Sequence, residues 1–323
     1  MVRTDNDSWD IATSVGATAV MVALARAAET GSHDPLIRDE YAATLVGTPE
    51  LAELRDRITS MFRSDEPDGP DSDDADDDAD AMDFAQMVDY QAVRTHFFDE
   101  YFGAASSIGI RQVVILAAGL DSRAYRLEWP SGTTVFEIDQ PKVLEYKTAT
   151  LNGAGATPSA SRREVAVDLR HDWPAALRDA GFDPDVPTAW LAEGLLPFLP
   201  ATAQDAMFAA IDDLSAGGSR IAIEVFGVDK AARREAEERW REVRAKREER
   251  GEDVSFDPFE LWYHDEDTPD SADWFATRGW TTQATETAGE FERLGRPMRE
   301  TPGRPRSFNN LFVTAEKPPQ PVG

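Results

Sequence analysis

Five short apolar runs recur along the chain, and a stretch with helical spacing separates each from the next. The runs have the length of strands, and continuous apolarity is typical of parallel strands buried on both faces. The expected strands cover residues 112–118, 133–138, 164–167, 188–192 and 220–226, and the helices between them cover about 121–127, 141–151, 173–180 and 201–214. Residues 281–287 and 310–315 add two late strands, expected as an antiparallel pair at the sheet edge. This alternation predicts an α/β protein with a mostly parallel, seven-stranded sheet and helices on both faces.

The first 110 residues follow a different pattern, which predicts a helical extension or lid. Helices are expected over residues 10–29, 35–46, 49–62 and 81–102. Residues 64–83 form an acidic loop with too few apolar side chains to offset the entropy of ordering. We therefore divide the chain into the extension (1–110), a Rossmann-like domain (111–316) with an insertion at 227–270 that holds a charged helix over 229–250, and a tail (317–323).

The composition excludes several classes of site. The 323 residues include no cysteine, which rules out disulfides, thiolate metal sites and cysteine nucleophiles. The four histidines are far apart in the sequence, so we expect no metal site. The sequence has no apolar run of membrane-spanning length and no export signal. We therefore expect a cytoplasmic protein that does not bind membranes.

Acidic residues dominate the charge of the chain. The sequence has 61 acidic and 33 basic residues, a formal net charge of −28. A field of this sign repels phosphates, so we expect no nucleic-acid partner. Only five of the basic residues are lysines. A low lysine content with abundant aspartate resembles the composition of proteins adapted to high salt, where ions screen the repulsion between acidic side chains. The alternative explanation is GC-rich codon usage together with one acidic insertion.

Each of the first four predicted strands is followed by a glycine or an acid. Gly119 follows the first strand, Asp139 the second, Asp168 and Leu169 the third, and Glu193 the fourth. Because ligands of doubly wound sheets bind at the carboxyl ends of the strands, these residues are expected to share one crevice. Acids around a crevice suit a cationic ligand better than a pyrophosphate, and the GxGxxG pattern of pyrophosphate sites is missing after the first strand.

The residue types indicate what each position can contact. Gly119 lets a ligand approach the backbone closely, and the Asp139 carboxylate can accept hydrogen bonds from two ribose hydroxyls. Asp168 can bond an exocyclic amine, and the amide of Leu169 can face a ring nitrogen. S-adenosylmethionine is a ligand that is cationic and carries both ribose and adenine.

The chain resembles the leucine carboxyl methyltransferase-like family, and within it the bacterial-type S-adenosyl-L-methionine-dependent methyltransferases. The resemblance extends from about Trp9 to Ala315. Its motifs are Arg94-Thr95 with Phe97-Phe98-Asp99, and residues 118–127, 136–141, 167–170 and 192–198. It implies a Rossmann-like class I methyltransferase fold in which residues 111–316 bind S-adenosylmethionine. The cofactor-binding residues that it implies are Arg94, Gly119, Asp139, Asp168, Leu169 and Glu193.

Within that resemblance, Arg94 corresponds to the arginine that meets the methionine carboxylate, and a guanidinium fork fits a carboxylate bidentately. Glu193 corresponds to an acid near the methionine part. Arg94 could instead be a surface arginine paired with a neighbouring acid. Arg123 and Arg126 are expected to brace the glycine loop through Asp121 or Glu137.

One residue departs from the family's pattern. Ala117 stands where the family more often has glycine. We expect its side chain to face the interior of the sheet and to leave Gly119 unaffected. The acidic loop 64–83 is also longer than expected, but it lies outside the motifs.

The expected activity is methyl transfer, most simply to an oxygen of a small-molecule or peptide carboxylate or hydroxyl. A carboxylate is already ionised at neutral pH, whereas a hydroxyl needs a general base nearby. No histidine lies at the end of a predicted strand, which favours a carboxylate or an acidic phenol. The sequence identifies no catalytic residue and leaves the oligomeric state open. Two alternatives are a Rossmann-type NAD-binding oxidoreductase, in which Asp139 holds the ribose, and a non-catalytic cofactor-binding module.

Overall fold

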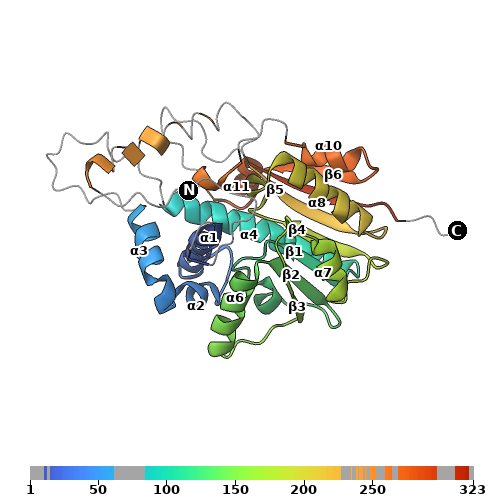
Figure 1. Cartoon of the computed structure of the whole chain (residues 1–323), viewed down its shortest axis with the longest axis horizontal. Helices are drawn as coiled ribbons and strands as arrows, with labels where there is room; N and C mark the ends of the chain where they lie inside the picture. The colour runs from blue at the N-terminus through green and yellow to red at the C-terminus, as the bar shows by residue number, and fades with distance from the viewer. Residues whose placement is uncertain are drawn as a thin grey trace.

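The computed structural model describes residues 11–12, 15–61, 84–226, 259–263, 268–296 and 310–319, with scattered positions between 234 and 251. The strands are β1 (Gln112–Leu116), β2 (Thr134–Asp139), β3 (Ser161–Ala166), β4 (Thr188–Ala192), β5 (Arg220–Val225), β6 (Thr281–Glu286) and β7 (Leu311–Glu316). They form one seven-stranded sheet with the spatial order β3-β2-β1-β4-β5-β7-β6 (Figure 1).

The direction of the strands confirms the predicted Rossmann-like class I methyltransferase fold. Strands β1 to β5 run parallel to one another, whereas β7 is antiparallel to both of its neighbours, β5 and β6. From β1 the chain builds outward to β2 and β3, and then returns to place β4 on the other side of β1. The order of the strands therefore reverses between β1 and β4, where doubly wound sheets bind their ligands.

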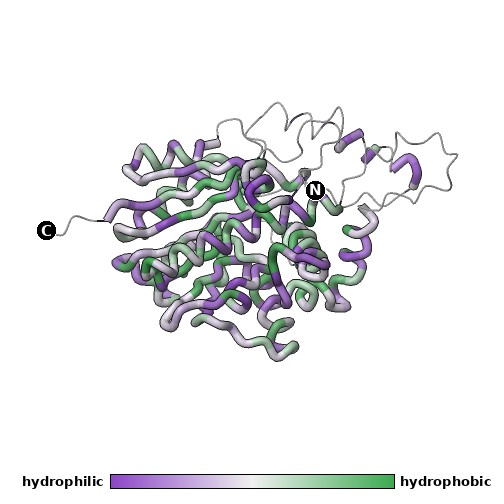
Figure 2. The backbone as a smooth tube through the Cα atoms, turned by 180° about the vertical axis from the view of Figure 1, so that it is seen from behind, coloured by the Kyte–Doolittle hydropathy of each residue, from purple (hydrophilic) through white to green (hydrophobic). Residues whose placement is uncertain are grey.

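Side chains of β1 alternate between two apolar cores, one on each face of the sheet. Val113 and Ile115 belong to the first core, and Val114 and Leu116 to the second. The first core is covered by α1 (Val15–Thr30), α4 (Phe84–Ser107) and α6 (Pro141–Gly153), and the second by α7 (Trp173–Asp179), α8 (Ala201–Asp213) and α10 (Ser271–Ala276). Both faces of the strand are buried, which explains its continuous apolar sequence. Hydrophobic and hydrophilic segments alternate along the helices in Figure 2, as expected for helices with one buried side.

The predicted helices of the N-terminal extension differ from the observed ones at their ends. In place of a helix over residues 35–46, the structure has only α2 (Ala42–Val46). Oδ1 of Asp39 accepts hydrogen bonds from the backbone amides of Tyr41 and Ala42, at 3.2 and 3.1 Å. The first backbone amides of a helix have no acceptor within the helix, and Asp39 supplies one for these two amides. The helix therefore begins at Ala42. The expected helix 49–62 is split into η1 (Pro49–Leu51) and α3 (Ala52–Met61).

Several shorter elements complete the described part of the chain. They are α5 (Arg123–Arg126), η2 (Leu196–Phe198), η3 (Phe259–Leu261) and α11 (Thr287–Arg293). Helix α11 was not predicted, because its sequence is mostly polar and Phe291 is its one buried large apolar side chain. The acidic loop 64–83 and much of the expected charged helix 229–250 lie outside the described residues, so the division of the chain into segments stays a prediction. Among the helices that the structure describes, none is both long and apolar enough to cross a membrane.

Candidate functional site

A crevice opens at the carboxyl ends of the first four strands, where their order reverses. All six residues predicted from the sequence line it: Arg94, Gly119, Asp139, Asp168, Leu169 and Glu193. Helix α1 contributes a further wall, with Val15, Thr18, Ala19, Val22 and Arg26. The crevice therefore lies between the N-terminal helices and the ends of the parallel strands.

The loop that follows β1 has an unusual backbone. Gly119 has a φ of +45°, in the left-handed region, and a Cβ placed on it would lie 3.2 Å from the Cβ of Ala19 on α1. Its amide donates a hydrogen bond of 2.6 Å to Oδ2 of Asp139, which comes from the neighbouring strand β2. Glycine at this position thus permits both the backbone conformation and the close approach of α1.

Ala117 also adopts a left-handed conformation, with a φ of +50°. Its side chain packs partly against the second core, but it is only partly buried and also lines the crevice. Ala117 therefore packs toward the interior of the sheet, as expected, and in addition lines the crevice. The chain must turn sharply as it leaves β1, and this turn places an alanine where glycine is favoured.

We expect Ala117→Gly to raise the free energy of unfolding by about 0.5–1 kcal/mol. The left-handed conformation costs a non-glycine residue about 1–2 kcal/mol, and the extra chain entropy of glycine offsets part of that gain. Urea unfolding measures the change. The matched control is Ala118→Gly, because Ala118 is 3% exposed and lies outside the left-handed region. The control should lower stability, and a loss of stability in both variants would contradict strain at Ala117.

Asp139 lies at the end of β2 with its carboxylate at the crevice. Its Oδ2 accepts a hydrogen bond of 2.6 Å from the backbone amide of Gly119, and its Oδ1 accepts one of 2.7 Å from the backbone amide of Gln140. Burial raises the pKa of Asp139, and the two amide hydrogen bonds only partly oppose this effect. A carboxylate has about four lone-pair positions, so each oxygen can accept one further hydrogen bond from a ligand.

Arg94 is buried, which rules out the alternative of a surface arginine. It is 5% exposed, and its guanidinium lies between two carboxylates from different strand ends. Its Nε forms an ion pair with Glu193 at 2.8 Å, and its Nη1 pairs with Glu224 of β5 at 3.0 Å. Nη1 makes the recorded hydrogen bonds, and Nε has only its ion pair with Glu193. Nη2 has neither a hydrogen bond nor an ion pair recorded to the described residues, so this side of the guanidinium is open to a ligand. Sequence reasoning missed Glu224, although an acid inside the apolar run of β5 was a signal.

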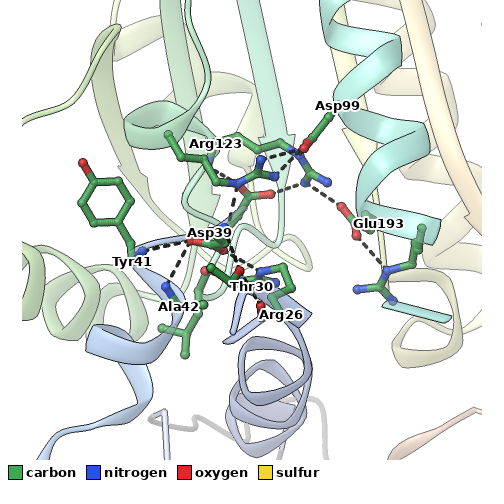
Figure 3. Close-up of polar contacts among 12 residues, drawn as sticks. Arg26, Thr30, Asp39, Tyr41, Ala42, Asp99, Arg123 and Glu193 are labelled. Carbon is green, nitrogen blue, oxygen red and sulfur yellow. Dashed lines mark hydrogen bonds and ion pairs between the residues drawn. The ribbon is translucent and has the colours of Figure 1, made fainter. Parts of the chain in front are cut away.

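Arg123 connects the glycine loop to the crevice wall. It donates to Asp99 and to Glu193, both at 2.7 Å, and also to the carboxylate of Asp121 (Figure 3). The expected brace through Asp121 is thus present. Arg126 instead forms a bidentate pair with Asp99, at 2.6 and 2.8 Å.

Glu137, the other expected partner of these arginines, pairs elsewhere. It is fully buried in β2, and its Oε2 lies 2.7 Å from both Lys147 of α6 and Arg162 of β3. Neither Arg123 nor Arg126 reaches it in the recorded contacts, because Asp99 and Asp121 are nearer the loop that carries the two arginines.

Two further cations hold consecutive carbonyls of the glycine loop. Arg26 of α1 donates to the carbonyl of Leu120 at 2.7 Å and pairs with Asp39 at 2.8 Å (Figure 3). Lys147 donates to the carbonyl of Asp121 at 3.0 Å. Neither residue was predicted to act at the site. The signal for Arg26 was its position on the apolar stripe of its helix, where a charge needs a buried partner.

Asp168 is already engaged by protein groups. Its carboxylate accepts two side-chain hydrogen bonds from Arg170, at 2.7 and 3.0 Å, and a third from Gln140 at 2.7 Å. Burial opposes ionisation, but the hydrogen bonds and charge of Arg170 outweigh it and lower the pKa of Asp168. The backbone amide of Arg170 donates a fourth hydrogen bond, at 2.8 Å, so the lone-pair positions of the carboxylate are all taken. A contact with an exocyclic amine would therefore have to replace one of these hydrogen bonds. Gln140, which follows Asp139, links the two acids.

Comparison with known proteins finds relatives that span the whole chain. The model of the family described as leucine carboxyl methyltransferase matches residues 19–212. A protein of Mycobacterium marinum named "Putative S-adenosyl-L-methionine-dependent methyltransferase" is 63% identical over 98% of this chain and 100% of its own length. A protein of the same name from Mycolicibacterium paratuberculosis is 54% identical over 93% of this chain and 90% of its own. A solved structure described as a "putative methyltransferase" from Thermobifida fusca YX aligns with a TM-score of 0.48 and 16% identity, over 85% of this chain and 92% of that one.

Proposed function

Since this chain belongs to the leucine carboxyl methyltransferase family, we propose that the six residues predicted from its sequence hold S-adenosylmethionine in the crevice. We also propose that the methyl group is transferred to an oxygen of the acceptor. The family makes the protein an S-adenosylmethionine-dependent methyltransferase (EC 2.1.1.-). It gives no support to the oxidoreductase or to the non-catalytic module.

The loop after β1 fits the ribose of this cofactor. Asp139 keeps one acceptor position on each oxygen, which suits the two ribose hydroxyls. Gly119 lies beside Asp139 and has no side chain, so the ligand can approach its backbone closely. At the next strand end, the amide of Leu169 has no recorded backbone acceptor in the described chain and can donate to a ring nitrogen.

The charge around the crevice suits a cation. A connected network of ion pairs holds five acids and four arginines: Asp39, Asp99, Asp121, Glu193 and Glu224 with Arg26, Arg94, Arg123 and Arg126. Acids thus exceed arginines by one, and Asp139 adds another carboxylate. S-adenosylmethionine carries a sulfonium, an ammonium and a carboxylate, a net charge of +1. We assign the methionine carboxylate to Nη2 of Arg94 and the ammonium to the neighbourhood of Glu193.

When bound, the cofactor supplies an activated methyl group, so the protein's task is to position the acceptor and exclude water. Apolar side chains on both walls, including Val22, Phe198 and Leu199, exclude water from the crevice. A nucleophilic oxygen held on the far side of the methyl group, in line with the sulfur, completes the arrangement.

One observation favours a carboxylate as the acceptor. Among the described residues, no histidine lines the crevice, and each acid that lines it already accepts hydrogen bonds from protein groups. Asp139 and Glu193 keep free acceptor positions, but we assign them to the ribose and to the ammonium of the cofactor, so neither is left to act as a base for a hydroxyl. An acceptor that arrives ionised needs no such base.

Transfer of a labelled methyl group to a panel of small carboxylic acids, phenols and alcohols tests this proposal. We expect a product that releases labelled methanol in alkali, as a methyl ester does. We also expect the rate of methyl transfer to stay constant from about pH 6 to pH 8, because carboxylates are ionised throughout that range. An alkali-stable product, formed at a rate that rises with pH, would contradict the carboxylate and indicate a hydroxyl.

A further inference from the structure

A buried hydrogen-bonded chain lies behind Arg94, away from the crevice. Glu224 is 0% exposed and accepts three donors: the guanidinium of Arg94, the hydroxyl of Tyr90 and, at 2.8 Å, the amide of Gly194. Tyr90 in turn accepts a hydrogen bond of 2.5 Å from the side-chain amide of Asn310. The chain thus joins four parts of the fold: α4, β5, the turn after β4 and the residue before β7.

The donors around Glu224 fit an ionised carboxylate. Three donors point at the two oxygens of Glu224. If the carboxyl were protonated, its own O–H would have to point at one of these donors. Burial and the nearby charge of Glu193 raise the pKa of Glu224, and the charge of Arg94 and the hydrogen bonds from Tyr90 and Gly194 only partly oppose this effect. Removing a donor therefore weakens the hold of this carboxylate on Arg94.

The geometry also limits where the guanidinium can go. Tyr90 and Arg94 lie one turn apart on α4, and both bind Oε1 of Glu224, with Arg94 at 3.3 Å from it and 3.0 Å from Oε2. Gly194 has a φ of +64°, and a Cβ on it would lie 3.8 Å from Nη1 of Arg94. Glu193 holds the other side of the guanidinium through Nε. Nη2 is thereby left to face a ligand.

We propose that Tyr90, through Glu224, is a positioning residue that orients Arg94 toward the carboxylate of the cofactor's methionine moiety. Tyr90 does not touch the ligand and acts only through the guanidinium. The inference rests on the assignment of that carboxylate to Arg94 under the proposed function. It predicts a selective effect: Tyr90 should matter only for ligands that carry the amino-acid group.

The test uses calorimetric titration of the full chain with S-adenosylhomocysteine and with 5′-methylthioadenosine, which lacks the amino-acid group. Tyr90→Phe should weaken binding of the first by about 5- to 10-fold and leave the second within about twofold. The loss is smaller than that of a direct hydrogen bond to a charged group, because Tyr90 acts on the ligand only through Glu224 and Arg94. The matched control is Tyr101→Phe. Tyr101 is another buried tyrosine of α4, and its hydroxyl donates to the carbonyl of Trp190 at 3.1 Å, away from Arg94. The control should leave both affinities unchanged.

The double variant Tyr90→Phe with Arg94→Met separates the possible outcomes. If Tyr90 acts through Arg94, its effect on S-adenosylhomocysteine should vanish once Arg94 is methionine. Equal losses for both ligands in Tyr90→Phe, no loss for either, or an undiminished effect in the double variant would each overturn the inference. If Arg94→Met alone does not reduce the preference for S-adenosylhomocysteine, the proposed assignment of Arg94 fails first.

Discussion

Replacement of Asp139 with alanine should weaken binding of S-adenosylmethionine and S-adenosylhomocysteine by about 100- to 10,000-fold. The variant loses two hydrogen bonds from ribose hydroxyls to a charged acceptor, each contributing about 1.5–3 kcal/mol. It also leaves the amide of Gly119 without the acceptor that holds it at 2.6 Å. Calorimetric titration with both ligands measures the change.

Asp183→Ala is the matched control for this variant. Asp183 is an exposed acid that precedes β4, at the opposite end of the sheet from the crevice. The control changes the net charge by the same amount, and its affinities should equal those of the wild type. If Asp139→Ala bound within about threefold of the wild type, Asp139 would not hold the ribose.

Arg123→Met should lower the free energy of unfolding by about 3–5 kcal/mol, the usual consequence of removing one partner from a buried ion pair. Arg123 is 2% exposed and donates to three acids from three segments: Asp99, Asp121 and Glu193. Asp99 keeps Arg126 and Glu193 keeps Arg94, so Asp121 is the carboxylate that loses its main cation. Methionine keeps most of the volume but none of the donors. Urea unfolding at neutral pH gives the difference.

Arg220→Met provides the comparison, because it removes an arginine from a partly exposed pair. Arg220 contacts Glu316 at 2.8 Å, and the side chain of Glu316 is 47% exposed. Pairs of this kind contribute about 0–1 kcal/mol, so this variant should stay close to the wild type. Similar losses in both variants would show that Arg123 is no more than an ordinary ion-pair partner.

The pH dependence of stability should reveal the same network. Burial alone would raise the pKa of Asp121, but the charge of Arg123, followed by that of Lys147, lowers it from 3.8 to about 2. A carboxyl whose pKa is depressed by folding stabilises the protein above pH 3.8, and this contribution is lost as the pH falls toward 2. Arg123→Met removes the main cause of the depression. Its unfolding free energy should therefore fall less between pH 4 and pH 2 than that of the wild type.

The central strands β1, β2, β4 and β5 were predictable because burial on both faces produces a continuous apolar run in the sequence. The expected strand 188–192 coincides with β4, and the others differ from the observed strands by a few residues at their ends. The acids of the crevice were predictable for a related reason. In a parallel sheet, residues directly after consecutive strands must meet at one edge, so Asp139 and Glu193 could be placed together without coordinates.

The partners of these residues were not predictable, because they come from segments far apart in the sequence. Glu224 lies 130 positions from Arg94, and only the strand order reveals that β5 brings it to α4. The bond from Arg26 to the carbonyl of Leu120 spans 94 positions. In both cases the sequence showed a charge in an apolar setting, which indicates that a partner exists but not which residue it is. The cytoplasmic location and the adaptation to high salt stay predictions.

A crystal structure of the protein with S-adenosylhomocysteine bound tests the account most directly. We predict both ribose hydroxyls on the carboxylate of Asp139, the adenine beside Leu169, and the amino-acid carboxylate within hydrogen-bond distance of Nη2 of Arg94. A ligand bound outside this crevice, or a ribose that does not contact Asp139, would contradict the site proposed for this methyltransferase.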